Sequence, residues 1–228
     1  MKKKQYLIML LILVAMLSAS TFNMKLTVGD DLWNFSNIYK MTKGWIIYKD
    51  INVIITPLFF YLGEIFLKIF GTNLMMYRIY AFFIVYIFTF IETYILFRKI
   101  KINNIDAILW TILLTIFTVF LIDTASYNML AIAFVILGII NALKYKRNII
   151  DNITQGIIIF LIFMTKQNIG IYYIAGLALS NLLKYKKIKV IFKYIFVQIT
   201  TFLLLFAIYL LAIKNYNMYD FINYAFLG

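Results

Sequence analysis

The sequence predicts an all-α fold: a polytopic bundle of about seven transmembrane helices, with interfacial helices in the first extracytoplasmic loop. Three observations predict it. Of the 228 residues, 64% are apolar and only 14% are charged. The mean hydropathy is +0.92, and a water-soluble domain of such a composition would expose more contiguous apolar surface than soluble monomers show. The apolar residues also fall in long runs, which short basic clusters separate.

The basic clusters give these runs an orientation. They lie at Lys2–Lys4, Arg98–Lys101, Lys144–Arg147 and Lys184–Lys189, and basic clusters at alternate ends of hydrophobic spans mark the cytoplasmic side. The net charge of +13 therefore indicates membrane topology, and nucleic acid is not expected as a partner. We expect a multi-pass plasma-membrane protein with one transmembrane domain over residues 1–228, a cytoplasmic N-terminus and an extracytoplasmic C-terminus.

The first apolar run, residues 5–22, follows three lysines. A secretory signal peptide has the same pattern, and Ser18-Ala19-Ser20 would supply small residues for cleavage. The apolar runs that follow favour an uncleaved first transmembrane helix instead. In either case residues 23–73 are expected to form an extracytoplasmic loop, which contains the only long stretch not dominated by apolar residues.

This loop is expected to contain two interfacial helices, the first over residues 31–42. Its apolar side comprises Leu32, Phe35, Ile38 and Tyr39. The polar residues Asp31, Asn34 and Lys40 lie off that side. The arrangement is typical of a helix that lies in the plane of the membrane surface.

The second interfacial helix is expected over residues 57–70. Thr56 is a favourable N-cap, Pro57 suits the first helical position, and Gly71 can end the helix. At 1.5 Å per residue the helix would extend about 21 Å. Because the hydrocarbon core of a bilayer is about 30 Å thick, this helix is expected to lie on the membrane or dip into it.

The remaining spans are expected at about 74–97, 107–122, 129–143, 153–165, 169–183 and 190–213. A single helix over residues 153–183 would be about 46 Å long. It would also bury Lys166 near its centre, at a cost of at least ~2.5–3.5 kcal/mol. Two helices that turn outward at Lys166 keep both flanking basic clusters in the cytoplasm, so we expect a hairpin. Residues 214–228 then form an extracytoplasmic tail.

The chain contains no histidine and no cysteine. The commonest general base and the thiolate nucleophile are therefore absent, and acid–base chemistry would depend on Asp, Glu, Lys or Tyr. We predict no cofactor and no metal-ligating residue, while a divalent cation held by oxygen ligands stays open. Most acidic residues fall on the expected outer face, so any chemistry is expected there.

A series of short motifs follows the first helix. It consists of the pair Asp30-Asp31, the element Gly44-x-x-x-Tyr48-x-Asp50, the helix from Pro57-Leu58 to Gly71, and Arg78 at the start of the next span. The corner Thr165-Lys166-Gln167-Asn168 comes later. The order of the motifs over residues 1–100 resembles the GT-C superfamily of membrane glycosyltransferases, of the protein O-mannosyltransferase and aminoarabinose-transferase type. The corner is similar to a Lys-Gln element of bacterial members.

The resemblance implies transfer of a sugar from a polyprenyl-phosphate donor to an acceptor on the outer face of the membrane. An outer-loop aspartate would act as general base, and cations would stabilise the departing phosphate. Asp30 and Asp31 are the candidate catalytic residues. The candidate substrate-binding residues are Arg78, Lys166, Gln167, Tyr48 and Asp50. The expected partners are the polyprenyl-phosphate sugar and membrane lipids, and the acceptor is open.

Alternatives stay open for these residues and for the chain. Asp30 and Asp31 could serve only as a solvated helix start, and Arg78 and Lys166 only as interfacial anchors. Family members usually continue through further spans and often end in a soluble domain, so the chain is interpreted as a fragment, a split gene product or a minimal homologue. The alternative functions are a lipid-glycan transporter or flippase, for which Glu92 is the main ionisable residue within a span, and a non-catalytic fragment or subunit.

Overall fold

The computed structural model describes residue 11 and residues 29–82, 88–121, 126–144, 148–185, 188–212 and 218–227. Within these ranges all regular structure is helical and no strand occurs, so the all-α prediction is confirmed. The first expected span, residues 5–22, lies outside the described residues except for Leu11. The chain divides into two compact units, the first comprising Met1–Lys43 and Phe60–Ala133, the second Gly44–Phe59 and Phe134–Gly228.

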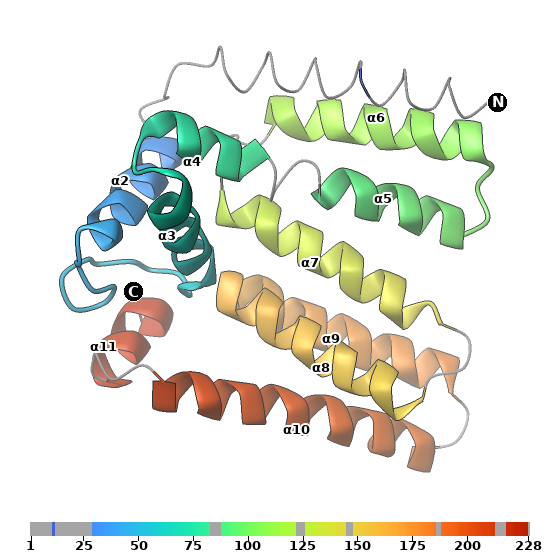
Figure 1. Ribbon diagram of the computed structural model, residues 1–228. Helices are drawn as coiled ribbons and strands as arrows, with labels where there is room; N and C mark the ends of the chain where they lie inside the picture. The colour runs from blue at the N-terminus through green and yellow to red at the C-terminus, as the bar shows by residue number, and fades with distance from the viewer. Residues whose placement is uncertain are drawn as a thin grey trace. The chain divides into compact units, whose positions relative to one another are not determined.

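The described helices that lie wholly or mainly in the first unit are α2 (Asp30–Thr42), α3 (Leu58–Phe70), α4 (Leu74–Tyr80), α5 (Phe88–Lys99) and α6 (Asn104–Leu121). The helix α7 (Tyr127–Ala142) begins in this unit and continues into the second. Figure 1 labels each helix. The expected span 74–97 is thus described as α4 and α5, and residues 83–87 lie outside the described ranges.

Aromatic side chains join α2, α3 and α4. The ring of Trp33 in α2 meets Phe60 in α3 edge-on, with 5.5 Å between ring centroids. Phe35 and Tyr77 connect α2 to α4 at 5.3 Å. Such aromatic contacts bury large areas and favour edge-on or tilted geometry. The three helices therefore form one packed corner of the first unit.

The helix α3 confirms the predicted end and shifts the predicted start. Gly71 has a φ of +122°, and its N–H donates to the carbonyl of Leu67 at 2.9 Å, which is the helix termination that favours glycine. The helix begins at Leu58, one residue later than predicted. The hydroxyl of Thr56, the predicted N-cap, donates to the carbonyl of Phe163 at 2.7 Å and so connects the residues before α3 to α8 (Ile149–Thr165).

The helix α2 confirms that residues 31–42 are helical, with one residue more at the start of the helix. Its apolar side divides between two environments, because Ile38 is fully buried whereas Leu32 is 43% exposed. On the other side Asp31 and Asn34 are buried, with 8% and 0% exposure. The hydropathy pattern predicted that the polar side of this helix would face water. In the structure part of that polar side is buried within the protein.

The second unit contains the C-terminal part of α7 and the helices α8 (Ile149–Thr165), α9 (Gln167–Lys184), α10 (Ile188–Ala212) and α11 (Met218–Ile222), followed by the π-helix η2 (Asn223–Leu227). The backbone is extended at Lys166, with φ −155° and ψ 108°, so the expected hairpin at this residue is confirmed. α8 and α9 lie side by side, and α10 packs along α8 (Figure 1).

Polar side chains lie inside the second unit and connect its helices. Asn141 of α7 donates to Gln155 of α8 at 2.7 Å, and Gln155 donates to the hydroxyl of Tyr173 in α9 at 2.6 Å. Gln198 of α10 donates to Asn152 of α8 at 2.8 Å. Buried polar groups need such partners because an unpaired one costs about 1–3 kcal/mol. The network therefore fixes how these helices pack against one another.

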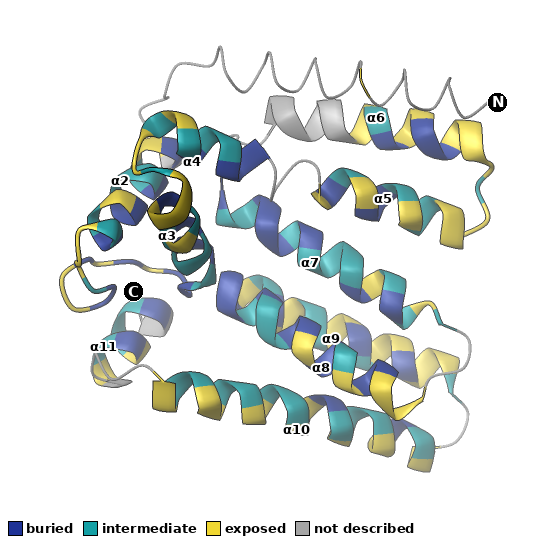
Figure 2. Ribbon diagram, viewed as in Figure 1, coloured by how far each residue is buried: buried dark blue, intermediate teal, exposed yellow. Residues whose placement is uncertain are grey.

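Exposed residues lie along the helices of the second unit (Figure 2), and many of them are large apolar side chains. Among the residues that the structure describes, α10 is the one helix long and apolar enough to cross a membrane. Its 25 residues extend about 37 Å at 1.5 Å per residue, which exceeds a hydrocarbon core of about 30 Å. Large side chains along it are exposed, such as Phe196 at 71% and Leu211 at 77%.

Candidate functional site

The candidate site in the second unit begins with the loop of residues 44–57. Asp50 closes the loop on itself, since its carboxylate accepts the N–H of Ile46 at 2.8 Å while its own N–H donates to the carbonyl of Ile46 at 2.8 Å. Gly44 enters the loop with a φ of +93°, a conformation that glycine adopts without strain. The predicted substrate-binding residue Asp50 is thus exposed and held in place by its own turn.

Tyr48 lies at the tip of this turn and has a φ of +65°. A non-glycine residue adopts this left-handed conformation at a cost of about 1–3 kcal/mol, which surrounding contacts must offset. The buried ring packs edge-on against Phe221 with 5.4 Å between centroids, and its hydroxyl donates to the carbonyl of Ile55 at 2.6 Å. These contacts give Tyr48 a structural role, while substrate binding by this residue stays a prediction.

Gln167, the first residue of α9, joins the loop to the α8–α9 corner. Its side-chain carbonyl lies 3.4 Å from the N–H of Thr56, which donates to it. Its amide nitrogen donates to the carbonyl of Ile54 at 3.1 Å and to the carbonyl of Ala225. The side chain is 7% exposed. A single amide therefore joins the start of α9 to two distant segments, the loop at Ile54 and Thr56, which are 113 and 111 residues away in the sequence, and the C-terminal segment at Ala225, which is 58 residues away.

Thr56 makes the second connection between the loop and this corner. The four last carbonyls of an α-helix have no partner within the helix, and Phe163 lies in the last turn of α8. The hydroxyl of Thr56 supplies a donor to the Phe163 carbonyl at 2.7 Å. The motif around Thr56-Pro57 and the Lys166-Gln167 corner, which are about 110 residues apart in the sequence, are thus neighbours in the fold.

Lys166 lies between the end of α8 and the start of α9 and is half-buried. Its N–H donates to Ile162 at 2.9 Å, and its carbonyl accepts the N–H of Gly170 at 3.1 Å. A Cβ at Gly170 would come within 2.7 Å of the Phe163 backbone, so glycine permits the tight corner. The start of a helix carries partial positive charge. This charge and the ammonium of Lys166 would both attract an anion.

The C-terminal segment contributes contacts that the sequence did not predict. Residues 214–228 were expected to form a tail, whereas α11 and η2 place Phe221 against Tyr48 and the Ala225 carbonyl against Gln167. Phe221 and Ala225 are buried, with 1% and 2% exposure. Because Phe221 and Ala225 are four residues apart, they would lie on one face of a helix, and this spacing could have indicated a buried helical face from the sequence.

The other predicted site residues, Asp30, Asp31 and Arg78, belong to the first unit. Asp30 and Asp31 occupy the first two positions of α2 after Gly29, and the cap has no side-chain hydrogen bond. Acidic residues are favourable there because the N-terminus of a helix is partially positive. Arg78 lies in α4, half-buried, and α2 and α4 touch through Phe35 and Tyr77. The base candidates and one phosphate-binding candidate therefore belong to packed neighbouring helices.

The predicted site is thus described in two groups, one in each unit. Asp30, Asp31 and Arg78 form the first, and Tyr48, Asp50, Lys166 and Gln167 form the second. Among the described residues, no three acidic side chains come together as a metal site would require. Comparison with known proteins found no matching family model, no similar curated protein and no similar solved structure.

Proposed function

We propose that the chain is a membrane glycosyltransferase of the GT-C type, which moves a sugar from a polyprenyl-phosphate donor to an acceptor on the extracytoplasmic face. One observation carries the proposal: the Pro57-Leu58 motif and the Lys166-Gln167 corner both take part in the family resemblance, and the residues directly before Pro57 are hydrogen-bonded to the corner through Gln167. A contact between two distant motifs is what a shared site requires.

The distribution of polar and apolar side chains supports a polytopic membrane protein. Buried residues of α8 include Asp151, Asn152 and Gln155, whereas Ile153 and Ile157 are exposed at 40% and 39%. In water this arrangement would place apolar side chains against solvent and polar ones inside, at a cost on both counts. In a bilayer it is favourable. We assign seven spans, with α8 and α9 as a hairpin and α10 as the last.

In the proposed reaction a carboxylate of Asp30 or Asp31 takes the proton of the acceptor hydroxyl. The acceptor oxygen forms a bond to the anomeric carbon of the sugar, and the bond from that carbon to the phosphate oxygen breaks. The polyprenyl phosphate leaves with the electron pair, so negative charge grows on its oxygens. Preorganised cations stabilise that charge most where water is excluded.

Lys166 and Arg78 are assigned to the lipid phosphate. Lys166 is supported by its position at the start of α9, where its charge and the helix dipole act in the same direction. Gln167 and Tyr48 position the loop, and Asp50 keeps its turn closed. The candidate substrate-binding residues thereby divide into two cations, one in each unit, which stay the candidates for the phosphate, and three residues that position the loop.

The test is a transfer assay on membranes that contain the chain and a polyprenyl-phosphate sugar. Asp30→Asn, Asp31→Asn and the double variant are compared with the wild type. Loss of a general base lowers the rate by about 10²–10⁴-fold, so we expect at least one single variant to show such a loss. Asp106→Asn is the matched control, because this carboxylate belongs to the start of α6 on the expected cytoplasmic side.

Normal transfer by both single variants and by the double variant would contradict the base assignment. If the wild type transfers no sugar from any polyprenyl-phosphate donor, the chain is instead a non-catalytic fragment or subunit. Because Glu92 is 3% exposed in α5 within an expected span, a transporter is the second candidate. Sugar transfer measured in detergent solution distinguishes the two functions. A glycosyltransferase can act there, whereas a transporter cannot, because detergent solution has no two compartments.

A further inference from the structure

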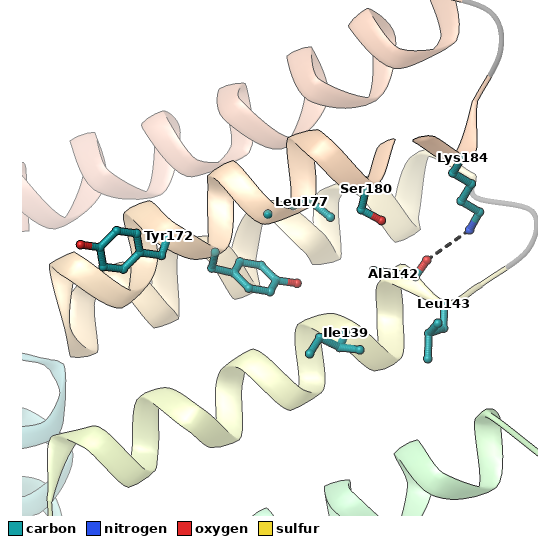
Figure 3. Close-up of a pocket in the computed structure, with 9 residues that line it drawn as sticks. Ile139, Ala142, Leu143, Tyr172, Leu177, Ser180 and Lys184 are labelled. Carbon is teal, nitrogen blue, oxygen red and sulfur yellow. Dashed lines mark hydrogen bonds between the residues drawn. The ribbon is translucent and has the colours of Figure 1, made fainter. Parts of the chain in front are cut away.

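A groove of about 580 Å³ lies between α7 and α9, within the second unit. Ile139 and Leu143 line it from α7 and the turn after it, and Tyr172 and Leu177 line it from α9 (Figure 3). Its volume falls in the range of about 300–1,000 Å³ that is usual for sites that hold small organic ligands. The groove opens to the side, because Tyr172 is 76% exposed and Leu143 is 45% exposed.

The length of the groove matches one leaflet of a bilayer. From Tyr172 to Lys184 the helix α9 advances about 18 Å at 1.5 Å per residue. Half of a hydrocarbon core of about 30 Å is about 15 Å. An acyl chain that runs along α9 would therefore stay within a single leaflet.

The groove ends at a cation. The ammonium of Lys184 donates to the carbonyls of Ala142 and Lys144 at 3.2 and 2.8 Å, and Figure 3 shows it beside the end of α7. These carbonyl groups orient the ammonium, but because they are uncharged they do not neutralise its positive charge. Ser180 adds a hydroxyl about one turn earlier along α9. The apolar groove thus has one polar, positively charged end, which is complementary to an anionic lipid headgroup.

The same end belongs to the basic clusters that mark the expected cytoplasmic side. Lys144 pairs with Asp151, while Lys189 and Lys193 of α10 are exposed. The cytoplasmic leaflet carries anionic lipids, and each nearby lysine contributes about 1 kcal/mol of attraction to them. The positive charge at one end of the groove, its length of about one leaflet and its apolar lining are therefore all complementary to an anionic lipid.

We propose that this groove binds an anionic phospholipid of the cytoplasmic leaflet, with one acyl chain along α9 and the phosphate at Lys184. This site is distinct from the proposed donor site, which lies at the opposite end of the α8–α9 hairpin, at Lys166. The inference does not depend on the glycosyltransferase assignment, because it uses only α7, α9 and the basic end of the second unit.

Gly176 allows the groove to be filled without disturbing the fold. A Cβ at Gly176 meets no atom within 4 Å, whereas a Cβ at Gly138 would come within 2.2 Å of the Tyr173 hydroxyl. Leucine at position 176 would therefore occupy the groove, and it favours helix more than glycine does. Ala175, one position earlier, is exposed and does not line the groove, so Ala175→Leu is the matched control.

The experiment titrates the purified full chain in detergent with phosphatidylglycerol or phosphatidylcholine of identical acyl chains and counts bound lipids by native mass spectrometry. We expect one phosphatidylglycerol per chain, bound more tightly than phosphatidylcholine. Lys184→Gln is expected to weaken this binding about fivefold, the factor that corresponds to one lysine near an anionic surface, and Lys184→Arg to retain it. Lys49→Gln is the charge control and is expected to bind as the wild type does, because this exposed lysine belongs to the loop that is hydrogen-bonded to the Lys166-Gln167 corner, at the other end of the α8–α9 hairpin.

Gly176→Leu is expected to lose the bound phospholipid, and Ala175→Leu to keep it. Ser180→Leu is a second filling variant, and elution volume and circular dichroism establish that each variant folds. Equal binding of both lipids by the wild type, or unchanged phosphatidylglycerol binding by the folded Gly176→Leu chain, would overturn the proposal. A lipid-free dimer that Gly176→Leu abolishes would also overturn it, because a second copy of the chain would then fill the groove.

Discussion

At the scale of single residues, Gln167 makes three long-range hydrogen bonds within the candidate site described above. Its amide satisfies the N–H of Thr56 and the carbonyls of Ile54 and Ala225. Gln167→Ala would remove the hydrogen bonds to all three groups, and those to Thr56 and Ala225 are buried, at about 1–3 kcal/mol for each group that water cannot reach. We expect a lower melting temperature and a lower transfer rate together. Asn168→Ala is the control, since Asn168 is adjacent and exposed.

The measurement for Gln167 is a thermal melt of the purified chain beside the transfer assay. If Gln167→Ala melts as the wild type does, the amide does not hold the loop to the corner. If the variant keeps its stability but loses transfer, Gln167 contacts the substrate directly, as the sequence predicted. The two readouts thereby separate a positioning residue from a binding residue.

Tyr48 allows a sharper separation, because its hydroxyl and its ring can be removed one at a time. Tyr48→Phe removes the hydrogen bond to Ile55 and should reduce the free energy of unfolding by about 0.5–1.5 kcal/mol. Tyr48→Gly relieves the left-handed backbone but loses the contact with Phe221. We therefore expect Tyr48→Gly to be the less stable of the two. Denaturant unfolding measures both, and a more stable Tyr48→Gly chain would show that backbone strain outweighs the aromatic contact.

At the scale of helices, glycine decides where two of them meet closely. A Cβ at Gly156 in α8 would come within 2.7 Å of the backbone carbonyl of Gln198 in α10. Small residues at such positions allow transmembrane helices to approach. Gly156→Ala is expected to cost about 1–3 kcal/mol through overpacking.

Gly176→Ala is the matched control for Gly156→Ala, because the same change in α9 meets open space and should add about 0.5–1 kcal/mol of helix stability. Melting temperatures of the two variants should therefore move in opposite directions. If both variants melt alike, α8 and α10 do not approach each other as closely as the structure has them.

The helices also show what the sequence could and could not predict. The break at Lys166 was predictable because a charge within one long span is costly and the flanking basic clusters require a return to the same side. The end of α3 at Gly71 was predictable because that position needs a left-handed residue. The contact between Thr56 and Gln167 was not, since neither periodicity nor capping relates positions 111 residues apart.

The burial of polar residues on α2 could not be predicted for another reason. Hydropathy separates apolar from polar sides, but a helix at a membrane surface meets lipid, water and protein. Asp31 and Asn34 are buried, and in sequence they resemble residues exposed to water. The role of α11 and η2 escaped prediction in the same way, because a short segment after the last expected span resembles a tail until Phe221 meets Tyr48.

At the scale of the whole molecule, the absence of cysteine in all 228 residues makes the proposed topology directly testable. Single cysteines can replace four exposed residues, namely Asn104, Asn168, Lys189 and Tyr219. A membrane-impermeant maleimide applied to intact cells should label cysteine at 168 and 219 but not at 104 and 189. All four should be labelled after the membrane is permeabilised, which controls for access to each site.

The labelling pattern tests whether α9 and α10 each cross the membrane. Since α9 connects position 168 to the connector before 189, and α10 connects 189 to α11, each helix that crosses the membrane must reverse the accessibility. Equal labelling of 168 and 189 in intact cells would show that α9 does not cross the membrane. Protection of both positions would show in addition that the Lys166 corner does not face a donor in the outer leaflet. A labelled 168 with a protected 104 would instead place the Lys166-Gln167 corner on the face where a polyprenyl-phosphate sugar and a free acceptor can meet.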